Sequence, residues 1–330
     1  MANIIKTQFN DFIKLKKHKG NPISEQSIKI YNSQFNSLLD SFNKATTPKF
    51  LLNSENVLNV LKKSFTNINT LKLKVNIILI ALECFYSKTK NYEENKEIYN
   101  EYLTNIIKDI KEQTNSHIAS QTQIEKSLSK DENELIINTL KKNIKHSIQN
   151  NDDLEDLKQY IIYMIFENNP MRADIATSKF ILIKDKPKMQ TDQNYIILDK
   201  QNKDVIYVQV NYKTKKHYEE NEITLHKDLY KYIAKLYNYY NNKLKIKNKY
   251  FLFQKDNKTP FNENNLSKFY KNIGNEILKK PISIHVNRTQ YASIDGDSID
   301  ILEEKAKKQN HSMSVHTTTY YKRGLKSKQE

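Results

Sequence analysis

The stretch that decides the fold lies near the C-terminus and reads IHVNRTQYAS at 284–293, then QNHSMSVHTTTYYKR at 309–323. It places His285 and Arg288 one helical turn apart, His311 23 residues after Arg288, and Tyr320 nine residues after His311. Imidazole, guanidinium and phenol groups can move protons and stabilise negative charge. The spacing therefore predicts a site for chemistry in this part of the chain.

Arginine is rare in this chain. Of 54 lysines and arginines, only three are arginine: Arg172, Arg288 and Arg323. Because lysine is the default cation here, an arginine that persists indicates a need for the planar fork of donors that lysine lacks. Two of the three, Arg172 and Arg288, stand where guanidinium groups could bind a phosphate group.

Length and charge bound the class of protein. A chain of 330 residues is long enough for two domains, each with its own core. The formal charge is +16, and residues 1–120 and 121–330 are both basic, by +6 and +10. This distribution favours a polyanion wrapped by both parts, although a solvated lysine surface would have the same composition.

Cysteine content and hydropathy suit an intracellular protein. Cys84 is the only cysteine, so the chain alone can form neither a disulfide framework nor a thiolate zinc site. The longest apolar run, at 75–85, is too short to span a bilayer, and the N-terminus has no signal-peptide pattern. We expect a soluble intracellular protein that does not act at a membrane.

Apolar residues recur at helical spacing through the first third of the chain. The helices expected there cover 24–42, 54–65, 71–86 and 92–114, with Ser24 as the first N-cap. The polar stretch 115–130 loses this period and predicts an interdomain linker. We therefore expect a helical, DNA-binding domain at 1–118.

Residues 119–330 predict a second domain that is mainly helical. The expected helices are 131–148, 154–166, 226–241, 263–278, 285–293 and 298–308, with a further short helix beginning near Arg172 after Pro170. Alternating patterns at 180–185, 195–200, 205–212 and 222–225 predict strands of a small antiparallel sheet. The predicted fold class is mainly α with this small sheet, an α+β chain.

Cleaving a phosphodiester requires a nucleophile, positive donors on the phosphate oxygens and a proton for the leaving oxygen. Tyr320 can supply the nucleophile, although a phenol has an ordinary pKa of about 10. Arg172 and Arg288 offer two guanidinium forks, and His311 a further donor. A lysine in the loop after residue 212 can protonate the leaving hydroxyl.

These residues, in this order, resemble the catalytic signature of the tyrosine recombinase (phage-type integrase) family. The matching pieces read NPMRAD, NYKTKK, HVNR, NHSMS and TTTYYKR, and they extend over about 120–323. The helices before them resemble the family's core-binding domain in general shape.

The resemblance implies a site of Arg172, Lys213, His285, Arg288, His311 and Tyr320, a 3′-phosphotyrosyl intermediate, and no metal or other cofactor. It also implies duplex DNA as partner, a homotetramer on two DNA sites, and integration or excision of a mobile or viral element. Such a protein would lie with DNA in a prokaryotic cytoplasm, or in the nucleus or viral factory of a eukaryotic host.

Several assignments stay open. Tyr321 competes with Tyr320 as nucleophile, Lys215 and Lys216 compete with Lys213, and His316 competes with His311 but more readily faces solvent or DNA. Arg172 could instead pair with Asp174 at the surface, and His285 could be a structural helix-start histidine. Asn310 and Thr289 stand where family members usually have glycine and histidine, and the tail after Tyr321 is short for an exchanged helix.

Other functions are compatible with the same residues. A type IB topoisomerase shares the nucleophile and the clamp, but usually carries lysine in place of His285 and acts as a monomer. A DNA-binding protein could keep the fold without turnover, and a lysine-rich RNA-binding protein would show no preference for duplex DNA.

Overall fold

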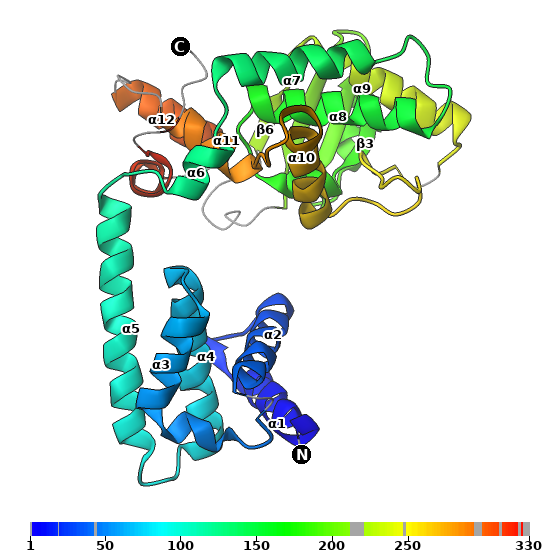
Figure 1. The fold of residues 1–330 in the computed structure, drawn as a ribbon. Coiled ribbons are helices and arrows are strands. Elements are labelled where there is room, and N and C mark those ends of the chain that lie inside the picture. The colour runs from blue at the N-terminus through cyan, green and yellow to red at the C-terminus, as the bar shows by residue number, and fades with distance from the viewer. Residues whose placement is uncertain are drawn as a thin grey trace. The chain divides into compact units, whose positions relative to one another are not determined.

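A computed structural model describes residues 2–18, 20–42, 45–211, 221–246, 249–293, 299–309, 312–322 and 325. The chain divides into two compact units, Met1–Ser116 and His117–Glu330, so the division falls two residues before the boundary expected at 118. The fold is mostly helical with one small four-stranded sheet, which confirms the predicted α+β class (Figure 1). Within the described ranges, no helix is long and apolar enough to cross a membrane.

The first unit is built from helices around a single core. Its elements are α1 (Ala2–Leu15), β1 (Lys17–His18), β2 (Asn21–Pro22), α2 (Glu25–Ser41), the 3₁₀ helix η1 (Pro48–Leu52), α3 (Ser54–Ser64), α4 (Ile68–Tyr86) and α5 (Tyr92–Asn115). Ser24 caps α2 as predicted, because its Oγ atom accepts a hydrogen bond from the Ser27 amide at 3.2 Å. Helix α4 is the most apolar helix and packs against α2 and α5.

Helix α1 was not among the predicted helices. Its apolar stripe is short, but Ile5, Phe9 and Ile13 follow one another at intervals of four and are all buried. The Phe9 ring stacks on Phe35 of α2 with a centroid distance of 4.0 Å. Packing against α2, more than the local pattern, therefore stabilises this helix.

The second unit contains the remaining elements. Its helices are α6 (Gln121–Lys126), α7 (Lys130–Asn143), α8 (Asn151–Asn168), α9 (Leu229–Asn238), α10 (Glu263–Leu278), α11 (Ile284–Ala292), α12 (Ile299–Lys308) and α13 (Met313–Val315). Shorter turns are the 3₁₀ helices η2 (Ala173–Thr177) and η3 (Ile183–Lys188) and the π-helical turns η5 (Tyr239–Lys243) and η6 (His316–Tyr320). Helix α6 lies inside the predicted linker, where Ser120 and Gln123 form a capping box.

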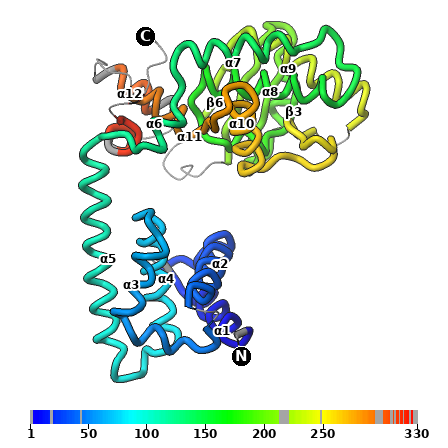
Figure 2. The backbone as a smooth tube through the Cα atoms, in the orientation of Figure 1, coloured from blue at the N-terminus to red at the C-terminus, as the bar shows by residue number. Residues whose placement is uncertain are grey.

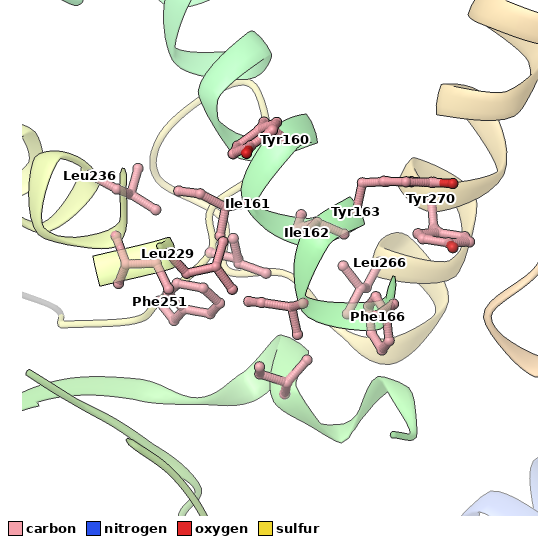
Figure 3. Packing of buried hydrophobic residues seen from close by; sticks show 14 of the residues in the cluster. Tyr160, Ile161, Ile162, Tyr163, Phe166, Leu229, Leu236, Phe251, Leu266 and Tyr270 are labelled. Carbon is pink, nitrogen blue, oxygen red and sulfur yellow. The ribbon is translucent and has the colours of Figure 1, made fainter. Parts of the chain in front are cut away.

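Helix α8 is the centre of this unit's core. Figure 3 shows its side chains Tyr160, Ile161, Ile162, Tyr163 and Phe166 together with Leu229 and Leu236 of α9, Leu266 and Tyr270 of α10, and Phe251. The Tyr163 and Tyr270 rings lie parallel at 5.8 Å, and the Tyr163 hydroxyl donates to the Asn133 side chain of α7. This core holds the end of α8, and hence the segment that follows it with Arg172, in a defined place.

The sheet has the order β3-β4-β5-β6, and the prediction that it is purely antiparallel is wrong. Strands β4 (Tyr195–Asp199), β5 (Asp204–Gln209) and β6 (Asn221–Thr224) pair antiparallel, but β3 (Lys179–Leu182) runs parallel to β4. The chain does not turn back tightly after β3. It passes through η3 and a further loop before β4 begins, and a connection of this length is what a parallel pair requires.

Candidate active site

One open pocket of about 690 Å³ in the His117–Glu330 unit collects several of the predicted site residues. Its lining comes from η2 with its N-cap, the segment after β5, α10 and α11. The lining residues are Arg172, Ala173, Asp174, Thr177, Asn211, Glu263, Ser267, Ile284, His285 and Arg288. Arg172 and the neighbouring pair His285 and Arg288, which lie far apart in the chain, therefore line the same space. The volume is large enough to admit a phosphate group with its flanking sugars.

Arg172 enters the pocket from the start of η2. Pro170 prevents α8 from continuing, because the residue before a proline is driven out of helical geometry. That residue, Asn169, is extended with φ −134° and ψ 95°. Arg172 is the N-cap of η2, one position before the first turn in which it was expected. Its side chain is half-buried and partly open to the pocket.

Helix α11 carries His285 and Arg288, and polar contacts hold it in the protein interior. The Asn287 side chain donates to the Phe166 carbonyl oxygen at 2.6 Å. The Gln290 side chain donates to the Leu128 carbonyl oxygen at 2.9 Å and accepts from the Leu128 amide at 3.1 Å. Leu128 stands two residues after the end of α6, so these bonds tie α11 to the segment that follows α6; Figure 2 traces both. These bonds fix the rotation of α11, and so the direction of the His285 and Arg288 side chains.

Arg288 is the centre of the site, and the residue is only 4% exposed. Its Nε donates to the Pro170 carbonyl oxygen, its Nη2 to the Gln309 carbonyl oxygen, and its Nη1 to the Tyr320 hydroxyl, at 3.3, 3.3 and 3.2 Å. Burial lowers the pKa of this group and the Tyr320 oxygen opposes that shift. Arginine still keeps its charge at neutral pH, because its ordinary pKa lies above about 12.

Tyr320 lies against the side chains of His285 and Arg288 on α11. Its ring is stacked under the Arg288 guanidinium at 4.8 Å and meets the His285 ring edge-on at 5.6 Å. Its carbonyl oxygen accepts from the Ser293 hydroxyl at 3.0 Å, which ties η6 to the end of α11. Tyr320 is buried, but its surroundings are polar and charged rather than an apolar core.

The two other candidates near Tyr320, Tyr321 and His316, lie in different surroundings. Tyr321 is half-buried, its ring meets His117 at 6.1 Å, and its carbonyl oxygen lies 3.4 Å from the His117 Nδ1 atom. His316 is completely buried, so the expectation that it faces solvent or DNA is wrong. It begins η6, and η6 packs against α11 and α12. The π-helical turn therefore directs this imidazole inward.

Asp174 was considered only as a partner for Arg172, yet it belongs to the pocket. Its carboxyl is buried and accepts from the Gln209 side chain at 3.0 Å. Burial raises the pKa of Asp174, while Arg172, the Gln209 hydrogen bond and Arg288 act to lower it. The Asp174 carboxyl group therefore interacts with the positive charges of both arginines and partly offsets them. The only signal in the sequence is its place two residues after Arg172.

The candidates Lys213, Lys215, Lys216 and His311 lie outside the described residues. The structure thus brings together Arg172, His285, Arg288 and Tyr320 of the predicted set, and their catalytic roles stay predictions. Among the residues that the structure describes, no group of three or more His, Cys, Asp or Glu side chains is arranged to hold a metal ion.

In comparison with known proteins, the chain matches solved structures and nothing else. No protein-family model matches the chain, and no curated protein matches it. Among solved structures the chain is similar to one described as the crystal structure of XerA recombinase, with 15% identity over 98% of this chain and 95% of that chain, and a TM-score of 0.40. Most side chains differ at this identity, so the chemistry of the pocket follows from this chain's own residues.

We expect His285 to titrate below its ordinary pKa. Although part of the side chain is open to the pocket, partial burial and then the Arg288 charge lower the pKa of His285 from 6.5. The unfolded chain therefore binds more protons below about pH 6.5, and acidification through this range removes stability until the folded pKa is passed. An NMR titration of the His285 Cε1–H signal, assigned with His285→Asn, should give a midpoint below 6.5.

The variant Arg288→Gln is the matched control for this titration. It removes the charge that is the second cause of the shift, so the His285 midpoint should rise toward 6.5. A wild-type midpoint at or above 6.5 would contradict the pocket electrostatics described above.

Proposed function

We propose that this chain is a DNA strand-exchange enzyme that cuts and rejoins duplex DNA through a 3′-phosphotyrosyl bond. The observation that carries the proposal is the convergence of Arg172, His285 and Arg288 on one pocket, with the Tyr320 hydroxyl 3.2 Å from the Arg288 Nη1 atom. These are the groups that the resemblance to tyrosine recombinases assigns to phosphate binding, proton transfer and attack.

In the proposed reaction, the Tyr320 oxygen attacks the scissile phosphorus and the bond from phosphorus to the 5′ oxygen breaks. Arg172 and Arg288 stabilise the charge that builds on the phosphate oxygens. His285 is suited to take the phenolic proton, because its lowered pKa keeps the imidazole neutral at pH 7. By the resemblance, His311 adds a donor and Lys213 protonates the leaving 5′ hydroxyl.

Rejoining is the reverse of this step with a different 5′ hydroxyl as attacking group. The covalent bond to Tyr320 conserves the energy of the broken phosphodiester, so the exchange needs no ATP. Further features follow from the resemblance and belong to the proposal: a tetramer on two DNA sites, and integration or excision of a mobile or viral element. The charge of +16, spread over both halves of the chain, suits duplex DNA held by many phosphate contacts.

The test is to capture the covalent intermediate. The full chain is incubated at low salt with a pool of nicked duplexes of randomised sequence, on which the short cleaved strand diffuses away and rejoining fails. Denaturing electrophoresis detects protein attached to DNA, and tryptic mapping identifies the attached peptide. We expect the peptide that contains Tyr320. A second incubation with supercoiled plasmid at high dilution separates a recombinase, which needs paired sites, from a topoisomerase that relaxes DNA as a monomer.

Two results would overturn the proposal. Binding to duplex DNA without any covalent product would indicate a DNA-binding protein that keeps the fold without turnover. Attachment through a residue outside the pocket would show that the chemistry lies elsewhere in the chain.

A further inference from the structure

Gln309 forms a reciprocal pair with Arg288 that the recombinase signature does not explain. The Gln309 Nε2 atom donates to the Arg288 carbonyl oxygen at 2.9 Å, and the Arg288 Nη2 atom donates to the Gln309 carbonyl oxygen at 3.3 Å. Gln309 is 2% exposed and directly follows α12. The pair therefore joins the end of α12 to both the backbone and the side chain of Arg288.

The orientation of the Gln309 amide is determined by this contact. Turning the amide over would place its Oε1 atom against the Arg288 carbonyl oxygen, which is also an acceptor. With Nε2 as the donor, Oε1 is buried and has no hydrogen-bond partner among the described residues. A buried acceptor without a partner costs free energy. Gln309 is thus a poor choice for stability at this position, where an apolar side chain would avoid the cost.

The second hydrogen bond of the pair is accepted by a carbonyl group at the end of α12. The Gln309 amide N–H bonds back to the Lys305 and Ala306 carbonyl oxygens, so its own carbonyl lies at the C-terminal end of α12. Carbonyl groups at this end lack partners within the helix and carry the negative end of its dipole. The Arg288 guanidinium satisfies one of them with a positive charge.

Arg288 consequently links three segments that hold the other functional residues. Pro170 stands two residues before Arg172, Gln309 two residues before His311 in the sequence, and Tyr320 is bonded directly. A guanidinium that turned away would release all three contacts at once. Any group that fixes the direction of Arg288 therefore acts on the whole site.

We propose that Gln309 is a positioning residue that holds Arg288 in the direction needed for reaction, at a cost in stability. The role in the reaction rests on the proposed function, whereas the hold on Arg288 does not. Gln309 touches no reacting atom and acts through Arg288. Its amide supplies the donor that sets the distance between α12 and α11.

The test compares Gln309→Met with Gln290→Met. Both remove a buried glutamine amide and keep a similar length of side chain. Among the described residues, however, the Gln290 amide bonds to the Leu128 backbone, whereas the Gln309 amide bonds to Arg288. The chain has only three arginines, so the ¹⁵N spectrum of arginine Nε–H groups contains three signals that are simple to assign. Arg288 Nε–H donates to a buried carbonyl and should exchange slowly with solvent in the wild type.

In Gln309→Met we expect the exchange of Arg288 Nε–H to accelerate at least about tenfold, whereas Gln290→Met keeps it slow. The thermal midpoint should be unchanged or raised in Gln309→Met, because an unsatisfied acceptor is removed, and lowered in Gln290→Met. Unchanged exchange in Gln309→Met, or a loss of thermal stability as large as that of Gln290→Met, would overturn the proposal.

The reaction is measured in parallel as the rate of covalent capture on nicked DNA. We expect Gln309→Met to lower this rate by on the order of 10-fold to 100-fold, with DNA affinity within about twofold of wild type. An unchanged rate would overturn the role in the reaction. If wild-type protein forms no covalent product, the proposed function fails, and the exchange measurement still decides whether Gln309 holds Arg288.

Discussion

Replacing Tyr320 with phenylalanine should abolish the covalent protein–DNA product while leaving DNA binding intact. The substitution removes a single oxygen atom, the one that accepts from Arg288 Nη1 at 3.2 Å. The aromatic ring keeps its place against the guanidinium and against His285. Without a nucleophile there is no route to a phosphotyrosyl bond, so capture on nicked DNA should fall below detection. Affinity for duplex DNA, measured by electrophoretic shift at low salt, should stay within about twofold.

Tyr321→Phe is the matched control, because it removes the same atom from the next residue. The Tyr321 ring packs beside His117 rather than beside Arg288. We expect this variant to keep the capture rate of the wild type within a few-fold. Loss of capture in Tyr321→Phe with full activity in Tyr320→Phe would assign the nucleophile to Tyr321 and contradict the geometry of the pocket.

Arg288→Lys should lower the capture rate by on the order of 10²-fold to 10³-fold and also destabilise the fold. Lysine keeps the positive charge, so a lower capture rate in this variant reflects the lost hydrogen-bond geometry of the guanidinium. The guanidinium reaches the Pro170 and Gln309 carbonyl oxygens and the Tyr320 hydroxyl from three different nitrogen atoms, whereas an ammonium is a single compact donor. Lost hydrogen bonds to a buried charged group should reduce the free energy of unfolding by about 2–4 kcal/mol, measured by urea denaturation.

Arg172→Lys separates the effect on the capture rate from the effect on the stability of the fold. Arg172 is half-buried at the pocket rather than enclosed, so the substitution should slow capture while changing the free energy of unfolding by less than about 1 kcal/mol. Equal losses of stability in the two variants would show that Arg288 is not the structural centre of the site. Wild-type capture in Arg288→Lys would show that a bidentate fork is not required there.

Local features of the site could be predicted from the sequence. A helix places residues three apart on one face, so the spacing of His285 and Arg288 already determined that they point the same way. Pro170 stops α8, and Arg172 therefore begins a new turn close to where it was expected. The scarcity of arginine pointed to Arg172 and Arg288, and both line the pocket.

Features that depend on contacts between distant segments could not be predicted in this way. The burial of His316, the place of Asp174 beside two arginines and the Gln309 pair all come from elements that meet only in the folded chain. The same is true of β3, which looked like one more antiparallel strand until its connection to β4 was known. An alternating pattern indicates a strand but not the direction of its neighbour.

By itself, the sequence determined the helical character of the chain, its basic charge and the common direction of His285 and Arg288 on one face of a helix. Each of these follows from composition or from short-range periodicity, which the backbone geometry of a helix converts directly into direction. Only the tertiary structure decided how Arg288 is held. Among the described residues, its hydrogen-bond acceptors come from positions 170, 309 and 320. No local rule relates positions so far apart, because their meeting depends on how the helices pack.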